Sequence, residues 1–365
     1  MLPKSSYCKI RITVILMITA VSCLFAGEVD FNAKFFELCD NACVELARDN
    51  LHVRGKQHYR DSYSVRALGV AYDMTGNEEY LEACKKWSDK MIKLQNGMTP
   101  AGAYYMNYGR KPGETTGNWY AADCASIAQG VLSTAVRCPK GSEKKVYMDS
   151  VKAYADLVIE NYIRPGGGVT DGIWSKYDGP WWCSTGIFGG LAFSLYYETG
   201  DEKYLNAGYG TIDWLNAQDL TKITPYTLEE QGPAMYMYVL EAYAAGLPFI
   251  EPDTARYKKV MARYDEALAW MEKMQVGRGG DNKWDYNTQW GSKSGGLAFH
   301  MYIYAKHVPD MYQICKEADK ELEYICSEPI NDPDKAVAEN TFTQLMNFTM
   351  MSLAERLSPG TMYRR

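Results

Sequence analysis

Two long stretches of the chain repeat one pattern, and this repeat limits the fold more than any other feature. "SYSVRALGVAYDMTGNEEYL" runs from Ser62 to Leu81, and "STGIFGGLAFSLYYETGDEKYL" runs from Ser184 to Leu205. Each stretch has a segment rich in small residues, then Thr-Gly, then acidic residues and a Tyr-Leu pair. A unit that returns in this way is typical of an architecture built from internal repeats.

Each repeat reads as a helical hairpin. In the first arm, small or apolar residues cover most of the helix circumference, which predicts a helix that is enclosed on nearly all sides. Gly76 then gives the stop signal, and the second arm, Asn77 to Leu94, begins with acids. This second arm carries its apolar residues on one stripe, namely Tyr80, Leu81, Trp87, Met91 and Ile92.

Weaker copies of the first arm complete a set of six. Counted from Ser62, the further buried arms begin near Ala122, Ser184, Pro233, Ser294 and Thr341. They start roughly 50 to 60 residues apart with long connectors, whereas open solenoids have shorter and more uniform repeats. We therefore predict an all-α fold, an (α/α)6 toroid of six helical hairpins. Residues 30–51 are expected to form an outer helix that packs against the seam of the ring.

Composition agrees with one large helical domain, which we place at residues 27–365. The chain has 365 residues, 47% of them hydrophobic, and no low-complexity linker divides it. A net charge of -6 without a cluster of Lys and Arg argues against a nucleic-acid partner. Four His residues in no metal-binding pattern, and a Cys39–Cys43 pair one turn apart, predict no metal and no cofactor.

The first 26 residues are predicted to be an export signal rather than part of the fold. Lys4, Lys9 and Arg11 precede a short apolar run, Ile12 to Val21, which is too brief to span a bilayer. "AVSC", ending at Cys23, loosely resembles the lipobox of bacterial lipoproteins; cleavage after Ala26 is the alternative. The protein is thus expected in the periplasm or at the cell surface, with membrane contact only through a possible lipid anchor.

Polar and aromatic residues stand at the start of every buried arm. Because all inner helices of a toroid of hairpins run the same way, these six clusters should converge on one end of the ring, where helix dipoles favour carboxylates. The clusters are His58, Arg60 and Asp61; Trp119, Tyr120 and Asp123; Asp178, Trp181 and Trp182; Glu229, Glu230 and Gln231; Asp285, Gln289 and Trp290; and Glu339 and Asn340.

Two interpretations of these clusters compete. A single Asp or Asn at a helix start is most often a cap. Acids crowded together with aromatic rings instead suit a carbohydrate site, because sugar C–H faces stack on rings while hydroxyls need carboxylates and amides. The candidate substrate-binding residues are His58, Arg60, Trp119, Tyr120, Trp174, Asp178, Trp181, Trp182, Glu230, Trp290, Lys293 and Asn340.

The chain resembles the six-hairpin glycosidase superfamily, and most of all the unsaturated glucuronyl and rhamnogalacturonyl hydrolases. The resemblance rests on Asp61 in "YRDSYSVRALGV" and Asp123 in "ADCASIAQGVLSTA", each at the start of an inner helix. It implies the removal of a terminal 4,5-unsaturated uronic acid. In this reading Asp123 is the general acid and base, and Asp61 holds the substrate or tunes Asp123.

One departure from the family pattern leaves other functions open. The family tends to place an Arg in a Trp-x-Arg-Gly-Gln-like motif, where this chain has "WWCSTGIFGG", so Arg60, Arg66, Lys176 or Lys293 would have to bind the uronate. A saturated uronide or a neutral sugar is an alternative substrate. A polysaccharide lyase using His58, Tyr63, Arg60 and Asn340, and a non-catalytic glycan-binding protein or helical scaffold, are the other interpretations.

Overall fold

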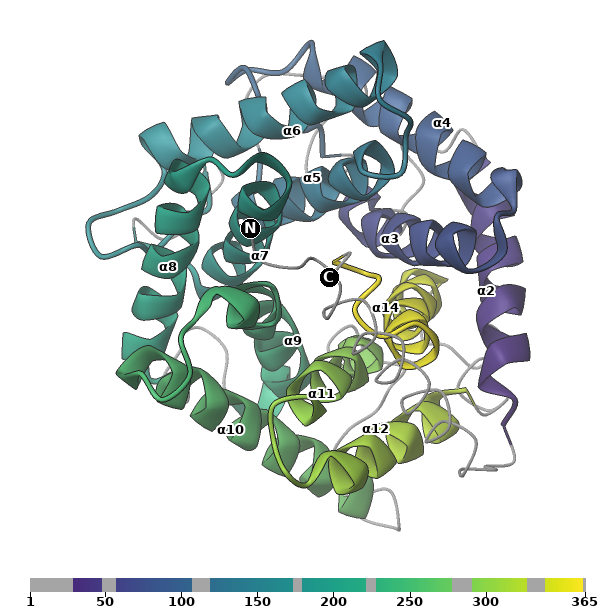
Figure 1. Ribbon diagram of the computed structural model, residues 1–365, viewed down its shortest axis with the longest axis vertical. Helices are drawn as coiled ribbons and strands as arrows, with labels where there is room; N and C mark the ends of the chain where they lie inside the picture. The colour runs from purple at the N-terminus through teal and green to yellow at the C-terminus, as the bar shows by residue number, and fades with distance from the viewer. Residues whose placement is uncertain are drawn as a thin grey trace, which may run out of the picture.

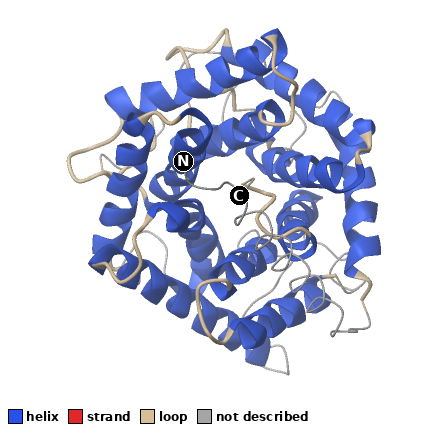
Figure 2. Ribbon diagram, viewed as in Figure 1, coloured by secondary structure: helices blue, strands red, loops and turns tan. Residues whose placement is uncertain are grey.

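The computed structural model describes residues 29–47, 57–106, 119–172, 179–220, 228–277, 291–326 and 339–363. The described residues form two concentric layers of helices arranged as a ring (Figure 1). Helices are the regular elements of these ranges, apart from two isolated bridges, as Figure 2 shows. The prediction of an all-α toroid is confirmed.

The inner layer consists of the predicted buried arms. Its helices are α3 (His58–Thr75), α5 (Ala121–Ala135), α7 (Trp182–Thr199), α9 (Leu228–Gly246), α11 (Leu297–Ala305) and α14 (Glu339–Leu357). Each packs against the next, and α14 packs against α3, so the ring closes. A toroid is therefore correct, and an open solenoid is excluded.

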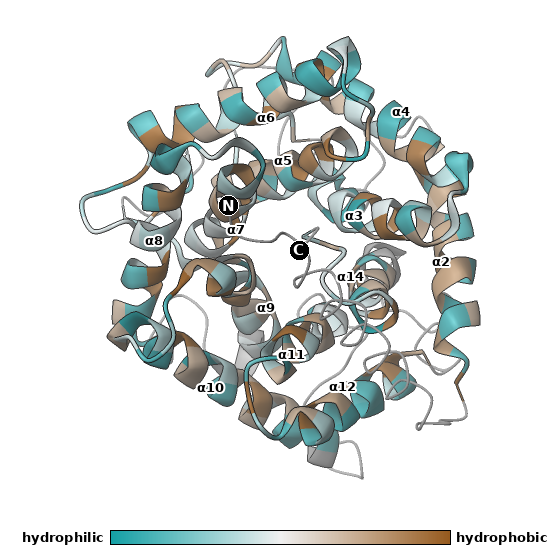
Figure 3. Ribbon diagram, in the orientation of Figure 1, coloured by the Kyte–Doolittle hydropathy of each residue, from teal (hydrophilic) through white to brown (hydrophobic). Residues whose placement is uncertain are grey.

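The outer layer encloses the first. Its helices are α2 (Phe31–Ala47), α4 (Glu78–Gln95), α6 (Ser142–Asn161), α8 (Glu202–Ala217), α10 (Ala255–Gly277) and α12 (Met311–Ile325). Hydrophilic and hydrophobic residues alternate along these helices, as Figure 3 shows for α6, α10 and α12. Helix α2 packs against α14, α3 and α4, so it lies at the seam as predicted.

Small residues let the inner helices approach each other closely. A Cβ added to Gly186 of α7 would lie 2.2 Å from the backbone oxygen of Tyr238 on α9. Only glycine fits at such a contact. The two clearest hairpins also end their inner arms in the same way, since Gly76 and Gly200 adopt left-handed conformations with φ of 69° and 68°.

The predicted starts of the inner arms were a few residues too late. Helix α3 begins at His58, so His58, Arg60 and Asp61 lie inside its first turn rather than before it. The fifth arm begins differently, with the 3-10 turn η4 (Gly291–Gly296) before α11. Three glycines and two serines in η4 favour an α-helix poorly, which accounts for the tighter turn.

Hydrogen bonds between side chains join neighbouring outer helices at equivalent places. We call three of them the tyrosine–aspartate links, each 2.9 Å long: Tyr80 to Asp40, Tyr147 to Asp89, and Tyr204 to Asp156. They connect α4 to α2, α6 to α4 and α8 to α6. Between α10 and α8 a bidentate Arg256–Asp213 pair at 2.7 Å takes this place. The repeat thus extends to the contacts between hairpins.

We expect Tyr204→Phe to lower the free energy of unfolding by about 1 kcal/mol, because one hydrogen bond is lost and the buried ring is kept. Tyr80→Phe should cost a similar amount, and the double variant should show the sum, since the two links join different helix pairs. Urea denaturation measures these changes. Tyr197→Phe, at a tyrosine that is 48% exposed, is the control and should leave stability unchanged. If wild type, Tyr80→Phe, Tyr204→Phe and the double variant were equally stable, a role for the links would be contradicted.

The core and the helices have further properties that bear on the site. One cluster of buried apolar side chains includes residues from Phe31 on α2 to Met362 near the end of the described chain. Among the described helices, none is both long and apolar enough to cross a lipid bilayer. The eight cysteines in the described ranges are all free thiols, Cys39 and Cys43 included. Residues 1–26, assigned to an export signal, lie outside the description.

Candidate active site

The first turns of several inner helices bring charged side chains together at one end of the ring. Arg60 comes from α3, Asp123 from α5 and Lys293 from η4, and the charges of Arg60 and Lys293 both act on the Asp123 carboxyl. All three side chains are buried. Residues far apart in the sequence therefore meet here.

Asp123 has the properties expected of a catalytic acid. Burial raises the pKa of its carboxyl well above the ordinary value, and the charge of Asp171 raises the pKa further. Arg60 and Lys293 oppose this effect and lower the pKa. The carboxyl is nevertheless held towards its protonated form, as a proton donor near neutral pH must be.

Asp123 is not the N-cap residue of its helix. The residue at the N-cap position of α5 is Tyr120, whose side chain makes no capping hydrogen bond. Gln57 occupies the same position at α3, again without a side-chain cap, so Asp61 is not a cap either. Neither acid therefore occupies the N-cap position, although both lie in first turns, where a carboxylate also interacts favourably with the helix dipole.

Asp171 is a site residue that sequence reasoning missed. It lies in the connection that leads to α7 and is 3% exposed. Its backbone oxygen accepts a hydrogen bond from Ala121 N at 3.1 Å, and its carboxylate accepts one from the Ser184 hydroxyl on α7. Burial raises its pKa to about 6, while hydrogen bonds from Ser184 and Tyr120 favour the charged form.

Arg60 and Lys293 are two buried basic groups beside the acids. The Arg60 Nε donates to the Tyr59 hydroxyl at 3.0 Å, and Gln344 Nε2 contacts the same hydroxyl at 3.5 Å. Burial lowers the pKa of Lys293 well below its ordinary value, and the Arg60 charge lowers it further. The Lys293 ammonium lies 5.8 Å from the centre of the Tyr238 ring. The site therefore offers cations that an incoming anion would stabilise.

Aromatic rings extend the site from Lys293. Trp182 stacks on Trp181 with ring centres 5.6 Å apart, and Trp182 also lies 6.3 Å from the Tyr238 ring. Trp181 is partly exposed, whereas Trp182 is buried. Of the pair, Trp181 has the accessible surface that stacking on a sugar requires.

Other predicted residues are placed differently. Asp61 lies 3.6 Å from His58 Nδ1 on its own helix, and the second carboxylate that acts on Asp123 belongs to Asp171. Trp119 is fully buried with its ring edge-on to Tyr162, at 4.7 Å between centres, so it presents no accessible face to a sugar.

Several predictions fall outside the description. Trp174, Asp178 and Trp290 are not among the described residues. Glu230 and Asn340 lie in the first turns of α9 and α14, but their side chains are not described. Across the described ranges, no group of three or more His, Cys, Asp or Glu side chains is arranged to hold a metal ion.

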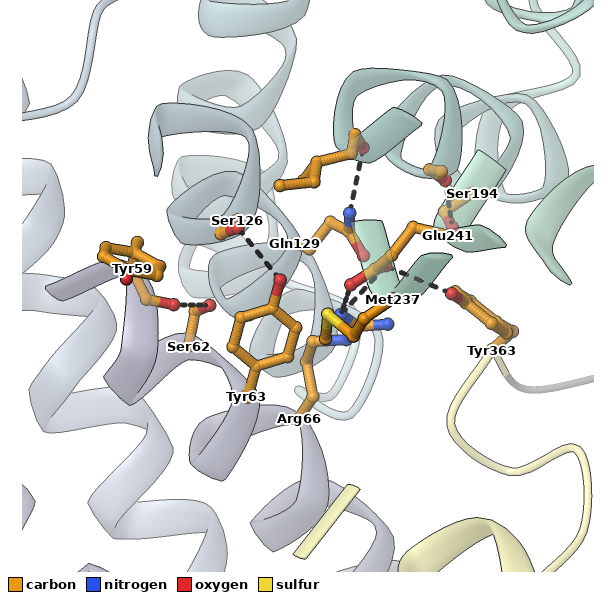
Figure 4. Close-up of polar contacts among 12 residues, drawn as sticks. Tyr59, Ser62, Tyr63, Arg66, Ser126, Gln129, Ser194, Met237, Glu241 and Tyr363 are labelled. Atoms are coloured by element: carbon orange, nitrogen blue, oxygen red, sulfur yellow. Dashed lines mark hydrogen bonds and ion pairs between the residues drawn. The ribbon is translucent and has the colours of Figure 1, made fainter. Parts of the chain in front are cut away.

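A buried ion pair lies deeper in the ring. Arg66 Nη1 contacts both carboxylate oxygens of Glu241 at 3.2 Å, and the Tyr363 hydroxyl donates to Glu241 at 3.3 Å. Figure 4 shows Glu241 between these two partners, with Gln129 and Tyr63 nearby. Residues 358–363 follow α14 and turn towards the centre of the ring (Figure 1). Because Glu241 neutralises Arg66, this candidate is unsuited to binding a substrate carboxylate.

Comparison with known proteins supports the fold. No family model and no curated protein matches the chain. An unsaturated glucuronyl hydrolase specific for heparin is similar in structure, with a TM-score of 0.60 and 10% identity over 89% of this chain and 97% of that one. A family 105 glycoside hydrolase of C. acetobutylicum has a TM-score of 0.60 and 12% identity, over 88% of this chain and 99% of that one.

A cellulase shares the architecture more distantly. Cel9M of C. cellulolyticum has a TM-score of 0.51 and 15% identity, over 82% of this chain and 79% of that one. At these identities the similarities establish the fold, which is the six-hairpin toroid expected from the sequence.

Proposed function

We propose that the protein is a glycoside hydrolase that acts on uronic-acid-containing oligosaccharides and removes a terminal unsaturated uronyl residue. The observation that carries this proposal is the buried Asp123 carboxyl, held towards its protonated form beside two buried basic groups, Arg60 and Lys293. The structural similarity to an unsaturated glucuronyl hydrolase and to a family 105 glycoside hydrolase supports the same choice.

The chemistry needs one group that first gives and then takes a proton. Asp123 donates its proton to the enol-ether carbon of the unsaturated ring, and the positive charge develops on the neighbouring C5. The resulting Asp123 carboxylate then accepts a proton from the water that adds to C5, so the acid is regenerated. The hydrated sugar opens and releases its neighbour, and the net reaction consumes one water.

A uronate carboxylate would be buried at this site, so it must meet positive charge. Arg60 is a fixed cation, and Lys293 becomes easier to protonate when an anion arrives beside it. Trp181 offers an aromatic surface that is linked to Lys293 through the rings of Trp182 and Tyr238. This combination fits a charged sugar better than a neutral one.

We expect Lys293→Met to raise KM for a uronide by roughly 10- to 100-fold, the value of a hydrogen bond to a charged group. kcat should change much less. The decisive comparison uses the methyl ester of the same uronide, which wild-type protein should bind weakly and the variant should bind as well as the acid. Lys203→Met, on the outer helix α8, is the control. Equal discrimination by wild type and variant would exclude Lys293 as the carboxylate ligand.

The lyase alternative finds less support. A lyase needs a base beside the uronate, and Tyr63, one candidate, is fully buried with its hydroxyl 3.4 Å from Ser126 Oγ. Burial raises the pKa of Tyr63 well above its ordinary value, which makes it a poor base. A non-catalytic glycan-binding protein would not need a buried, protonated carboxyl.

We also propose that the enzyme is exported to the periplasm or cell surface, from the basic and apolar pattern of residues 1–26. The mass of the mature N-terminus, measured after expression in a bacterial host, tests this. An acylated Cys23 would show a lipid anchor, and an unmodified N-terminus after Ala26 would show release. An uncleaved chain would contradict export.

The function itself is tested with purified protein and a panel of lyase-generated unsaturated oligosaccharides. Absorbance of the conjugated enol carboxylate should fall as the double bond is hydrated. An increase in absorbance on intact polymers would instead identify a lyase. Constant absorbance with both substrate types would exclude the proposed reaction and direct attention to saturated glycosides.

A further inference from the structure

We propose that Asp171 is a positioning residue of this site, which keeps Asp123 protonated for the first step and fixes the start of α7 against the start of α5. The role in catalysis rests on the proposed function. The electrostatic coupling between the two acids does not, and it can be measured on protein without any substrate.

The contacts of Asp171 tie it to two inner helices at once. Its backbone oxygen accepts from Ala121 N, at the first residue of α5, and its carboxylate accepts from Ser184 on α7. Tyr120, which precedes α5, also hydrogen-bonds this carboxylate. The carboxylate is therefore held in one place. Because Ala121 precedes Asp123 by two residues on α5, the contact at Ala121 also brings Asp171 close to Asp123, on which its charge acts.

Among the described residues, Asp171 is the acid whose charge opposes the ionisation of Asp123, and its effect adds to the larger effect of burial. Arg60 and Lys293 favour the charged carboxylate. Among the described residues, three tyrosines and one cysteine also act on Asp123 electrostatically, and burial raises the pKa of each so that they stay neutral. In the described part of the chain, the titratable and charged groups that act on Asp123 include Tyr59 and Arg60 of α3, Tyr154 of α6, Asp171, Cys183 of α7, Tyr238 of α9 and Lys293 of η4.

Asp171 has the right ionisation state for this role. Its pKa of about 6 means that it is mostly charged at neutral pH, helped by the hydrogen bonds from Ser184 and Tyr120. A charged Asp171 disfavours a second negative charge on Asp123. The two acids should titrate as a coupled pair, in which the second proton is lost at a higher pH than either acid alone would require.

The substitution Asp171→Asn removes the charge and keeps an oxygen that accepts from Ser184. Without the like charge, Asp123 ionises more easily, so the alkaline limb of the kcat/KM profile should move to lower pH by about one unit. Activity on the acid side of that limb should persist. Asp213→Asn, at a carboxylate on the outer helix α8, is the matched control and should leave the limb in place.

A readout without substrate separates this proposal from the function. Carboxyl carbon NMR of Asp-labelled protein, with Asp123→Asn used for assignment, follows the Asp123 titration directly. The upper titration step should move to lower pH in Asp171→Asn, even if no substrate is ever turned over. An Asp123 titration that is identical in wild type and Asp171→Asn would overturn the proposal.

If Asp171→Asn does not fold, Tyr120→Phe tests the same coupling. It removes one donor to the Asp171 carboxylate and should move the Asp171 titration step to higher pH. Less charge on Asp171 at neutral pH then lets the neighbouring Asp123 begin to ionise earlier. No movement of either carboxyl signal would overturn the proposal by this route.

Discussion

Asp123→Asn should abolish turnover of unsaturated uronyl oligosaccharides, with kcat lower by about 10²- to 10⁴-fold, the contribution typical of general acid–base catalysis. The amide has the same shape as the carboxyl but can neither donate the proton to the enol-ether carbon nor accept one from water. Substrate affinity should stay within a few-fold of wild type, because Arg60, Lys293 and the aromatic rings remain. Initial rates and equilibrium binding measure the two quantities separately.

Asp61→Asn is the informative companion. The family resemblance implies that Asp61 is the second acid of the site. In the structure Asp61 lies beside His58 instead, and the acid whose charge acts on Asp123 is Asp171. We therefore expect a smaller loss for Asp61→Asn than for Asp123→Asn. Full activity of Asp123→Asn would remove Asp123 from the mechanism, and a larger loss at Asp61 would transfer the acid role to that residue.

Glu241→Gln should lower the free energy of unfolding by about 3–5 kcal/mol, the cost of leaving one partner of a buried ion pair without its counter-charge. Glu241 is fully buried and Arg66 is 2% exposed, so solvent cannot replace the lost carboxylate. Tyr363 would lose an acceptor at the same time. The midpoint of denaturant unfolding, with its slope, measures the change.

Two further variants make this prediction specific. Asp213→Asn breaks the more exposed pair with Arg256 and should cost no more than about 1 kcal/mol. Replacing both Arg66 and Glu241 with apolar residues of similar size should recover much of the stability, since no buried charge is left unpaired. A loss at Glu241 as small as that at Asp213 would contradict the importance of the buried pair.

The sequence predicted the ring well because the repeat is a local pattern with a single packing solution. The small-residue arms of α3 and α7 and their Gly76 and Gly200 ends appear in the sequence as they do in the structure. The exact starts were harder to place, because Gln57 and Tyr120 begin their helices with extended backbone and without a side-chain cap.

The site was predictable only where its residues stand at helix starts. Arg60 and Asp123 were found in this way, Lys293 was named as a candidate cation for the uronate, and the structure brings the three together. Asp171 was missed, because it lies in a connection whose path depends on contacts to two helices that no local pattern encodes. Tyr238 was missed for another reason. It lies in the third turn of α9, where the sequence pattern of a buried helix indicates a core residue and not a site residue.

The packing of α14 against α3 also decides how the molecule should come apart. In an open array of hairpins the end units have one neighbour each, so they fray first and unfolding spreads inward. Here the seam gives every inner helix a neighbour on both sides. No hairpin is an end unit, so the loss of any one exposes the flanks of two others, and the ring should unfold as a cooperative whole in which amide protection is nearly uniform around the inner layer.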